Sequence, residues 1–290
     1  MYTYRNPDIQ CGNSGLSGLA MPEQKNAHYI LRGGIEGRER LRILARVMQP
    51  SALALLERVG VKPGMHCLDV GCGGGDLAFD LARMVGSSGR VVGTDIDPKK
   101  LELARAETEE HQLENVAFEL ADIANAAPGN TFDVVHARFV LTHLPDPQHA
   151  VLHMLSAVRP GGVLILQDVD FRGHFCHPEN PAFARFVRLY SETALRRGVD
   201  ANIGPRLVSF LIEAGLTDVQ MNIVQPAGMS GDVKLIAALT MESIADSVAA
   251  EGVALKAEVD ELVDALYDLA RDENCLMSVA RIVQVWGHRK

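Results

Sequence analysis

The chain has 290 residues, of which 47% are hydrophobic and 22% are charged, and its formal net charge is −9. This length suits one large domain with insertions, and the composition is ordinary for a globular protein. An acidic chain repels a phosphate backbone, and no run of about 18 apolar residues is present, so neither broad nucleic-acid binding nor a transmembrane helix is expected.

The first 28 residues are rich in Gly, Ser and Asn and lack a basic segment followed by an apolar one. Residues 1–28 are therefore predicted to form a flexible arm rather than a signal peptide. The five cysteines of the chain are scattered, odd in number and without CxxC spacing. This pattern indicates neither a disulfide framework nor a zinc site, and it fits a reducing, cytoplasmic location.

Residues 29–60 are predicted to form cap helices, because apolar residues such as Leu41 and Met48 recur at helical spacing. Pro50 is predicted to end the first helix, and a second helix is expected from Leu53 to Val59. We interpret the densest basic cluster of the chain, which lies in this segment, as a solvated helix face. Its members are Arg32, Arg38, Arg40, Arg42 and Arg46.

Short β-branched segments then alternate with helical ones as far as Asp170. Strands are expected at 65–70, 90–95, 116–120, 132–137 and 163–169. Helices are expected at 76–84, 98–111 and 147–158, with Asp97 as an N-cap and a turn at 159–162. This alternation predicts βαβ units, and hence an α/β fold with a doubly wound, mostly parallel sheet.

Beyond Asp170 the alternation is interrupted by helices. The expected elements are an inserted helix at 181–197, a helix at 205–214, a strand at 217–224, a helical stretch at 233–272 and a last strand at 278–289. We predict that residues 61–232 and 273–290 form the core and that 233–272 is a helical lid insertion. Together with residues 29–60 and the inserted helix, the lid is expected to cover the ligand edge of the sheet.

The stretch CLDVGCGGGDLA, residues 67–78, places four glycines in five positions between the first strand and its helix. In open α/β sheets ligands bind beyond the carboxyl ends of the strands, and glycine lets the backbone approach a ligand closely. A phosphate-binding loop would need a lysine that is missing here, and a dinucleotide fingerprint would need glycine where Asp76 stands. The expected ligand therefore lacks a diphosphate and carries positive charge.

Four segments, CLDVGCGGG, GTDIDP, ELADI and FDVVHARFVLTHL, occur in this order between residues 60 and 170. In order and spacing they resemble class I S-adenosylmethionine-dependent methyltransferases, particularly the small-molecule branch related to ubiquinone-type methylases. The resemblance implies a seven-stranded Rossmann-like methyltransferase sheet with a helical cap. It also implies S-adenosyl-L-methionine as the cofactor, S-adenosyl-L-homocysteine as the product, and methylation of an O, N or C atom of a small organic metabolite, as in secondary metabolism.

The resemblance assigns residues to the parts of the cofactor. Asp69 would favour the ammonium group, Asp95 would accept both ribose hydroxyls, and Ile96 would pack on the adenine face. Asp122 would accept from the exocyclic amine, and the N–H of Ile123 would reach the ring. The backbone of three loop glycines would lie beside the ligand, and these are Gly71, Gly73 and Gly75.

Three further residues are assigned to the methionine end of the cofactor. His136 and Arg138, at the end of the fourth strand, would pass the methionine portion, where the family often uses backbone groups. Tyr29 resembles an N-terminal tyrosine that folds back onto the cofactor carboxylate. These positions complete the expected cofactor site.

A general base is needed only if the acceptor must lose its proton early in the reaction. His143 and Asp168 are the best placed candidates beyond the strand ends, and structural roles are the alternative for both. His174 and His177 are spaced like a metal-binding pair, but no third ligand is in view, so no metal is expected.

The fourth strand is followed by HARF and not by [DNS]PP[YF], which argues against methylation of DNA bases or of protein glutamine. Three alternatives stay open: a non-methylating relative such as a lyase or pericyclase-like enzyme, a regulatory binding module, and a nicotinamide dehydrogenase, which Asp76 disfavours. The expected partner is a small-molecule substrate, with no nucleic acid and no membrane. A homodimer through the cap helices is a further expectation left open.

Overall fold

A seven-stranded sheet forms the centre of the computed structural model, which describes residue 31 and residues 34–126, 129 and 131–290. The strand order is β3-β2-β1-β4-β5-β10-β7, and β10 runs antiparallel to both of its neighbours while the other pairs are parallel. The strands are β1 (His66–Val70), β2 (Arg90–Asp95), β3 (Val116–Leu120), β4 (Phe132–Arg138), β5 (Val158–Asp170), β7 (Thr217–Val224) and β10 (Arg281–His288). The predicted doubly wound, mostly parallel seven-stranded fold is confirmed.

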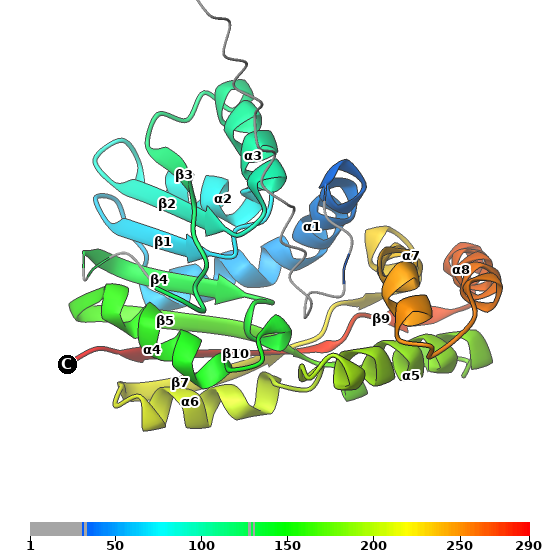
Figure 1. Cartoon of the computed structure of the whole chain (residues 1–290). Helices are drawn as coiled ribbons and strands as arrows, with labels where there is room; N and C mark the ends of the chain where they lie inside the picture. The colour runs from blue at the N-terminus through cyan, green and yellow to red at the C-terminus, as the bar shows by residue number, and fades with distance from the viewer. Residues whose placement is uncertain (1–30, 32–33, 127–128, 130) are drawn as a thin grey trace, which may run out of the picture.

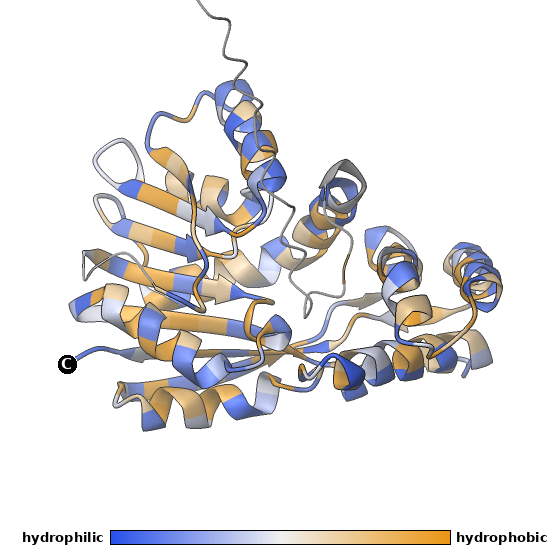
Figure 2. Cartoon of the chain, viewed as in Figure 1, coloured by the Kyte–Doolittle hydropathy of each residue, from blue (hydrophilic) through white to orange (hydrophobic). Residues whose placement is uncertain are grey.

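Helices cover both faces of this sheet (Figure 1). On one face, α2 (Asp76–Val85), α3 (Pro98–Glu110) and the second half of α1 (Gly34–Val59) pack on apolar side chains of the central strands. On the other face lie α4 (Pro147–Ala157) and α6 (Leu207–Glu213). Because both faces are covered, the central strands are mostly hydrophobic along their length (Figure 2).

Helix α1 runs without interruption through Pro50, so the predicted break at this proline is wrong. Proline removes one backbone hydrogen bond and bends a helix, but it does not have to end the helix. Met48 and Ala52, on either side of the proline, are both fully buried. The packing of both halves against the core therefore keeps them in one helix.

A cap of three helices lies beyond the carboxyl ends of the parallel strands (Figure 1). It contains α5 (Pro181–Arg196), α7 (Asp232–Ala250) and α8 (Lys256–Arg271), with a small sheet of β6 (Cys176–His177), β9 (Leu276–Ser278) and β8 (Ala227–Gly228). The helical stretch predicted at 233–272 is therefore two helices. They are separated near Gly252, which adopts a φ of 62° that ends the first of them.

Two segments differ from the predicted strand pattern. RPGG at 159–162, expected as a turn, belongs to β5 as an irregularity, because Phe132 pairs with Val158 while Val134 pairs with Val163. The last strand, expected at 278–289, is divided between β9 and β10. The predicted N-cap is confirmed, since the carboxylate of Asp97 accepts from the first backbone N–H groups of α3.

Among the described helices, none combines the length and the apolar character that crossing a bilayer requires. The arm predicted at residues 1–28 and the candidate Tyr29 lie outside the described residues.

Candidate functional site

The glycine loop between β1 and α2 contains positions where a side chain has no room. Gly71 has a φ of 65°, and a Cβ there would lie 2.4 Å from Cγ2 of Val140. Gly75 has a φ of 87°, and its Cβ would lie 2.6 Å from Cζ of Phe118. Residues with a Cβ rarely adopt this left-handed conformation. The loop therefore needs glycine at both positions to fold, whatever ligand it binds.

Helix α1 lies over the same loop. A Cβ on Gly74 would meet Cζ of Arg38 at 2.4 Å, and a Cβ on Gly73 would meet Cδ1 of Leu41 at 3.2 Å. The missing side chains of Gly73 and Gly74 thus leave room for residues of α1 as well as for a ligand. The backbone that the sequence predicts to be bare is partly covered by the protein itself.

Arg38 is the centre of an ion-pair network that joins α1 to α2 and α3. It is 3% exposed, and its guanidinium donates to Asp76 at 2.6 and 3.1 Å and to Glu107 at 2.6 and 2.9 Å. Arg42 also donates to Glu107, at 2.8 Å. Burial opposes the charge of Arg38, but its bonds to the two carboxylates raise its pKa above the ordinary value. Burial likewise opposes the charge of Glu107, whose pKa is nevertheless lowered by the arginines.

This network corrects two interpretations made from the sequence. The basic cluster is not simply a solvated helix face, because Arg38 is buried and Arg46 pairs with Asp232 of α7 at 2.6 Å. The negative charge of Asp76 is balanced by Arg38. Repulsion by Asp76 is therefore a weaker argument against a diphosphate ligand than the sequence suggested.

Asp95, at the end of β2, holds the glycine loop in place. Its Oδ2 accepts from the N–H of Gly73 and its Oδ1 from the N–H of Asp97, both at 2.9 Å, and the residue is 7% exposed. Each carboxylate oxygen retains a second lone pair for a ligand hydroxyl. The neighbouring Ile96 is 42% exposed, so its apolar side chain is accessible for packing against a flat ring.

Asp122 and Ile123 follow β3 and have different surroundings. The carboxylate of Asp122 is exposed and closes a turn, accepting from the N–H of Ala124 and from the amide of Asn125, each at 2.9 Å. Ile123 is buried, and its carbonyl is bonded to Nδ1 of His153 at 2.8 Å. Asp122 thus has a structural role in this turn, besides the contact with the cofactor that the resemblance assigns to it.

Asp69 and His136 lie opposite each other on the paired strands β1 and β4. Oδ1 of Asp69 is 2.8 Å from Nδ1 of His136, and the two residues are 3% and 0% exposed. Arg138, two residues along β4, has a guanidinium that makes no hydrogen bond or ion pair with any described residue and lies 5.8 Å from the ring of Phe139. Burial lowers the pKa of Arg138. The His136 side chain can therefore act on a ligand only through Asp69, whereas Arg138 can bind one directly.

Asp168, near the end of β5, is bonded to the short helix that contains His143. Asp168 is 1% exposed and accepts from the N–H of Thr142 at 3.1 Å and from that of Val169 at 2.8 Å, so it holds the 3₁₀ helix η1 (Leu141–His143). Burial raises the pKa of Asp168 to about 7. Burial also lowers the pKa of His143 to about 3. Both groups are thus biased towards their uncharged forms.

An aromatic cluster connects this region to the cap. The rings of Phe171 and Tyr190 stack at 3.8 Å, and the ring of His174 lies 4.3 Å from that of Phe171. His174 is also bonded to the carbonyl of Phe171 at 2.9 Å, and burial lowers its pKa to about 4. Within the described part of the chain, no three His, Cys, Asp or Glu side chains gather as metal ligands. Its ring contacts and its hydrogen bond make His174 part of the packing of this cluster.

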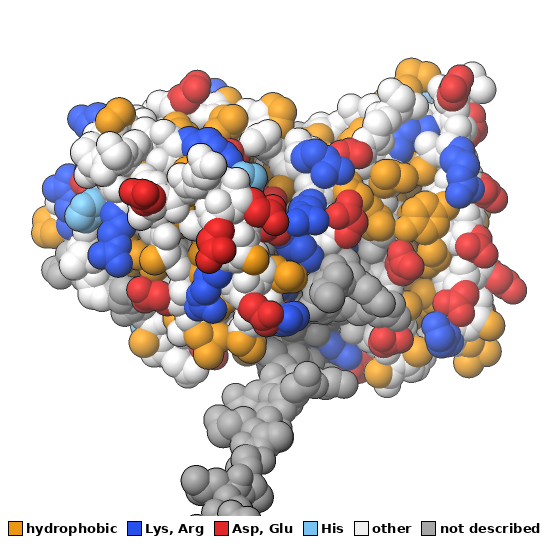
Figure 3. Space-filling view, turned by 90° about the horizontal axis from the view of Figure 1, so that it is seen from above, with side chains coloured by type: hydrophobic (Ala, Val, Ile, Leu, Met, Phe, Trp, Pro, Cys, Tyr) orange, Lys and Arg blue, Asp and Glu red, His pale blue; other side chains and the backbone are white. Residues whose placement is uncertain are grey.

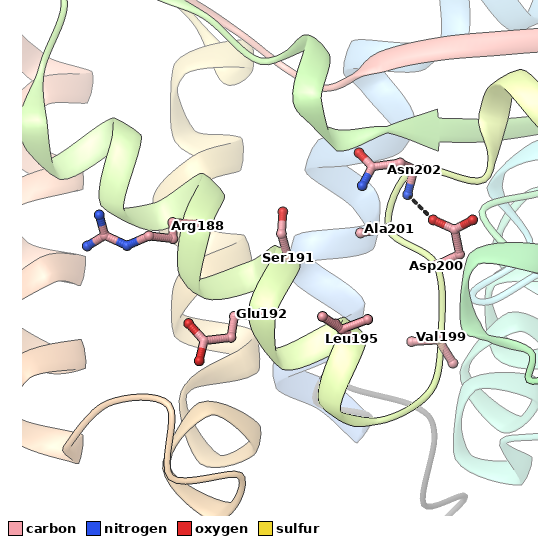
Figure 4. Close-up of a pocket in the computed structure, with 8 residues that line it drawn as sticks. All are labelled: Arg188, Ser191, Glu192, Leu195, Val199, Asp200, Ala201 and Asn202. Carbon is pink, nitrogen blue, oxygen red and sulfur yellow. Dashed lines mark hydrogen bonds between the residues drawn. The ribbon is translucent and has the colours of Figure 1, made fainter.

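Two surface hollows lie beside these elements. One, of about 370 Å³, is formed by α5 and the loop at 199–202, where the N–H of Asn202 donates to Asp200 (Figure 4). The other, of about 160 Å³, lies between α1 and α2 and is lined by Asp76 and Arg138 among others. Seen from above, acidic and basic side chains are interspersed over the sheet half, and hydrophobic ones gather on the cap (Figure 3).

Sequence reasoning missed Arg38 and Glu107 as the clamp on the loop, and it missed Gln167 beside His136. Nothing local marks the first two, because their partners are far along the chain. A glutamine inside the apolar segment VLILQDV was a signal that could have been found.

Residues 61–195 match a family model described as a methyltransferase domain. The ubiquinone/menaquinone biosynthesis C-methyltransferase of Hahella chejuensis is 34% identical over 142 residues, which cover 48% of this chain and 55% of that protein. The nocamycin O-methyltransferase of Saccharothrix syringae is 38% identical over 115 residues, covering 39% and 41%. The chain thus spans about half the length of the relatives that it matches.

Solved structures show the same fold. A putative methyltransferase from Bacillus halodurans superposes with a TM-score of 0.55 at 22% identity, covering 83% of this chain and 100% of that one. The [4+2]-cyclase SpnF superposes with a TM-score of 0.50 at 20% identity, covering 81% and 79%. At these identities the likeness speaks for the architecture alone.

Proposed function

This chain carries a class I methyltransferase domain at residues 61–195, and from this premise we propose that the protein transfers a methyl group from S-adenosyl-L-methionine to a small organic molecule. The observation that carries the proposal is the arrangement around the glycine loop. Buried carboxylates of Asp69 and Asp95 flank it at the ends of two adjacent strands. Such a site suits a cationic nucleoside better than a phosphorylated one.

The residues present fit this cofactor in chemistry. Asp95 and Ile96 suit the ribose hydroxyls and the adenine face, and Asp69 suits the ammonium group. The guanidinium of Arg138, which makes no hydrogen bond or ion pair with a described residue, suits the carboxylate, since an arginine can bind a carboxylate with two parallel hydrogen bonds. Tyr29 remains a proposed contact for the same carboxylate. Asp122 is the weakest of the proposed contacts, because its oxygens already close a turn.

When bound, the cofactor supplies an electrophilic methyl group, so the chain has to align the acceptor and exclude water. Residues of the cap and the aromatic cluster would enclose the acceptor. Asp168, with a pKa raised to about 7, is the proposed group to receive a proton if the acceptor must lose one. His143 stays uncharged near neutral pH and would serve as a hydrogen-bonding group beside it.

The finer points of the assignment are proposals as well. The acceptor atom is O, N or C, as the named C- and O-methyltransferase relatives suggest, and a role in secondary metabolism follows that analogy. A cytoplasmic location is proposed on the cysteine pattern of the sequence. The helices of the cap are proposed to act as a lid, and a homodimer through them remains a proposal.

A non-methylating relative is the second candidate, because a cyclase shares the architecture. Such an enzyme would use the same cofactor pocket without consuming the methyl group. The nicotinamide and regulatory alternatives predict different ligands or no turnover.

Calorimetric titration with S-adenosyl-L-methionine, S-adenosyl-L-homocysteine and NAD tests the cofactor assignment. We expect micromolar binding of the first two and none of NAD. Incubation with labelled methyl donor and a panel of phenols, amines and activated carbon acids then tests transfer. Turnover without label transfer would favour the non-methylating enzyme, and tighter binding of NAD than of the methyl donor would refute the proposal.

A further inference from the structure

A continuous row of hydrogen-bonded polar side chains crosses the middle of the central sheet. We call it the polar row, and its members are Asp69 on β1, His136 on β4, Gln167 on β5, Gln284 on β10 and Asn222 on β7. The successive bonds measure 2.8 Å from Asp69 to His136, 2.8 Å from His136 to Gln167, 2.8 Å from Gln167 to Gln284, and 3.1 Å from Gln284 to Asn222. The row therefore links five adjacent strands.

The polar row is buried inside an otherwise apolar part of the sheet. Its first four members are 0–3% exposed. Two residues away on each strand, the same face carries the buried side chains of Cys67, Val134, Ile165 and Trp286. Apolar side chains would pack at these positions at no polar cost, so a buried polar row calls for a specific reason.

All bonds of the row donate in one direction. The amide of Asn222 donates to the carbonyl of Gln284, and the amide of Gln284 donates to the carbonyl of Gln167. Gln167 therefore presents its own NH₂ to Nε2 of His136, which must accept and carry no proton. The proton of the neutral imidazole is then on Nδ1, where it donates to the carboxylate of Asp69.

The row ends beside the glycine loop. Oδ1 of Asp69 is the oxygen that His136 holds, and no described residue donates a hydrogen bond to Oδ2. Asp69 is two residues before Gly71. Because the hydrogen bond to Oδ1 fixes the orientation of the carboxylate, it also fixes the direction in which Oδ2 points. A fixed acceptor direction favours selective binding of an ammonium group.

We propose that the polar row positions the Asp69 carboxylate for the ammonium group of the cofactor, so that His136, Gln167 and Gln284 are positioning residues for cofactor binding. This inference rests on the proposed function. It assigns a role in binding to Gln284, which lies three strands away from Asp69 in the sheet.

The direction of the row is tested first, without any ligand. Nitrogen NMR of the full chain labelled on its histidines, with His136→Gln to identify the signal, reports which ring nitrogen carries the proton. We expect Nδ1 protonated and Nε2 unprotonated in the native protein. Gln167→Glu replaces the donor by an acceptor, so the ring should then carry protons on both nitrogens. A native ring protonated on Nε2 alone would overturn the inferred direction.

Cofactor affinity tests the positioning role. Gln167→Leu and Gln284→Leu should each weaken S-adenosyl-L-methionine binding about 10-fold in calorimetry. In these variants the ring of His136 is no longer held in place, so its N–H donates less well to the carboxylate of Asp69. Gln225→Leu is the matched control, because Gln225 is a half-buried glutamine that bonds only outside the row, to Gly173, Ser278 and Val279. The control should keep native affinity.

Thermal unfolding of each variant shows whether it is folded, and Gln284→Glu offers a conservative substitute if Gln284→Leu is not. Folded row variants that bind the cofactor as tightly as the control would overturn the positioning role while the proposed function stands. A native protein that binds no S-adenosyl-L-methionine would overturn the proposed function and this role together. The histidine spectrum would still decide the direction of the row.

Discussion

Two regions at the carboxyl edge of the sheet differ in how they stabilise ionisable side chains. At the ends of β1 and β2, charges are kept and compensated: Arg38 is held by two carboxylates, and Asp95 accepts two backbone N–H groups. At the end of β5, burial raises the pKa of Asp168 to about 7 and lowers that of His143 to about 3. The first stretch thus keeps its charges, and the second favours uncharged groups. The proposed function would use this difference to place a charged cofactor opposite a neutral acceptor.

The largest expected effect comes from removing the clamp of the charged stretch. Arg38→Met should lower the free energy of unfolding by about 3–5 kcal/mol, because it leaves the carboxylate of Asp76 without its cationic partner and that of Glu107 with Arg42 alone. Urea unfolding measures the loss. Arg46→Met is the control, since its pair with Asp232 is solvent-exposed and should contribute less than about 1 kcal/mol. Equal losses in the two variants would contradict the clamp.

The next effect concerns the loop itself. Gly71→Ala should lower the free energy of unfolding by about 2–4 kcal/mol and abolish cofactor binding, because strained backbone and a clash with Val140 add together. Gly86→Ala has a similar φ of 63° with nothing within 4 Å of the added Cβ, so it isolates the backbone strain alone. If both variants lose the same stability, the clash with Val140 is not what requires glycine.

Cofactor affinity gives a smaller effect. Asp95→Ala should weaken S-adenosyl-L-methionine binding by about 1–3 kcal/mol, because ligand hydroxyls and the N–H of Gly73 lose their acceptor. Asp122→Ala should weaken it less, since that carboxylate is exposed and closes a turn. Calorimetry at one pH compares the two. A larger loss for Asp122→Ala would reverse the assignment of these carboxylates.

The uncharged stretch is tested by the pH dependence of stability. The raised pKa of Asp168 stabilises the fold below about pH 4, and this contribution is lost as the pH rises towards 7. The lowered pKa of His143 stabilises the fold above about pH 6.5, and that contribution is lost as the pH falls towards 3. Between pH 4 and 6.5 the two slopes therefore oppose each other, each by about 1.4 kcal/mol per pH unit.

Single substitutions should separate these slopes. Asp168→Asn should make the protein lose stability more steeply on acidification, and His143→Gln should make it lose stability less steeply. Urea unfolding at a series of pH values measures both. Slopes identical to that of the native protein in both variants would show that this stretch does not discriminate against charge.

The sequence alone predicts the charged stretch better than the uncharged one. Glycines and strand-end carboxylates form local motifs, so the place of the loop after β1 and of Asp95 at the end of β2 could be predicted from a few consecutive residues. The Arg38 network is not, because its partners are 38 and 69 residues away in the chain. The stacking of Phe171 on Tyr190 likewise depends on how an inserted helix folds back. The prediction of a helix break at Pro50 was wrong because burial of Met48 and Ala52 stabilises the helix more than the proline destabilises it.

The antiparallel strand β10 has a consequence for how the chain acquires its structure during translation. β7 is made before β10, yet among the described strands β10 is its one pairing partner in the sheet. Until residues 281–288 have left the ribosome, β7 lacks its pairing strand β10, and the outer edge of β5 stays open to solvent or to a chaperone. Nascent chains arrested before residue 281 should thus be cleaved by protease in β7, whereas chains extended beyond residue 288 by a linker should resist.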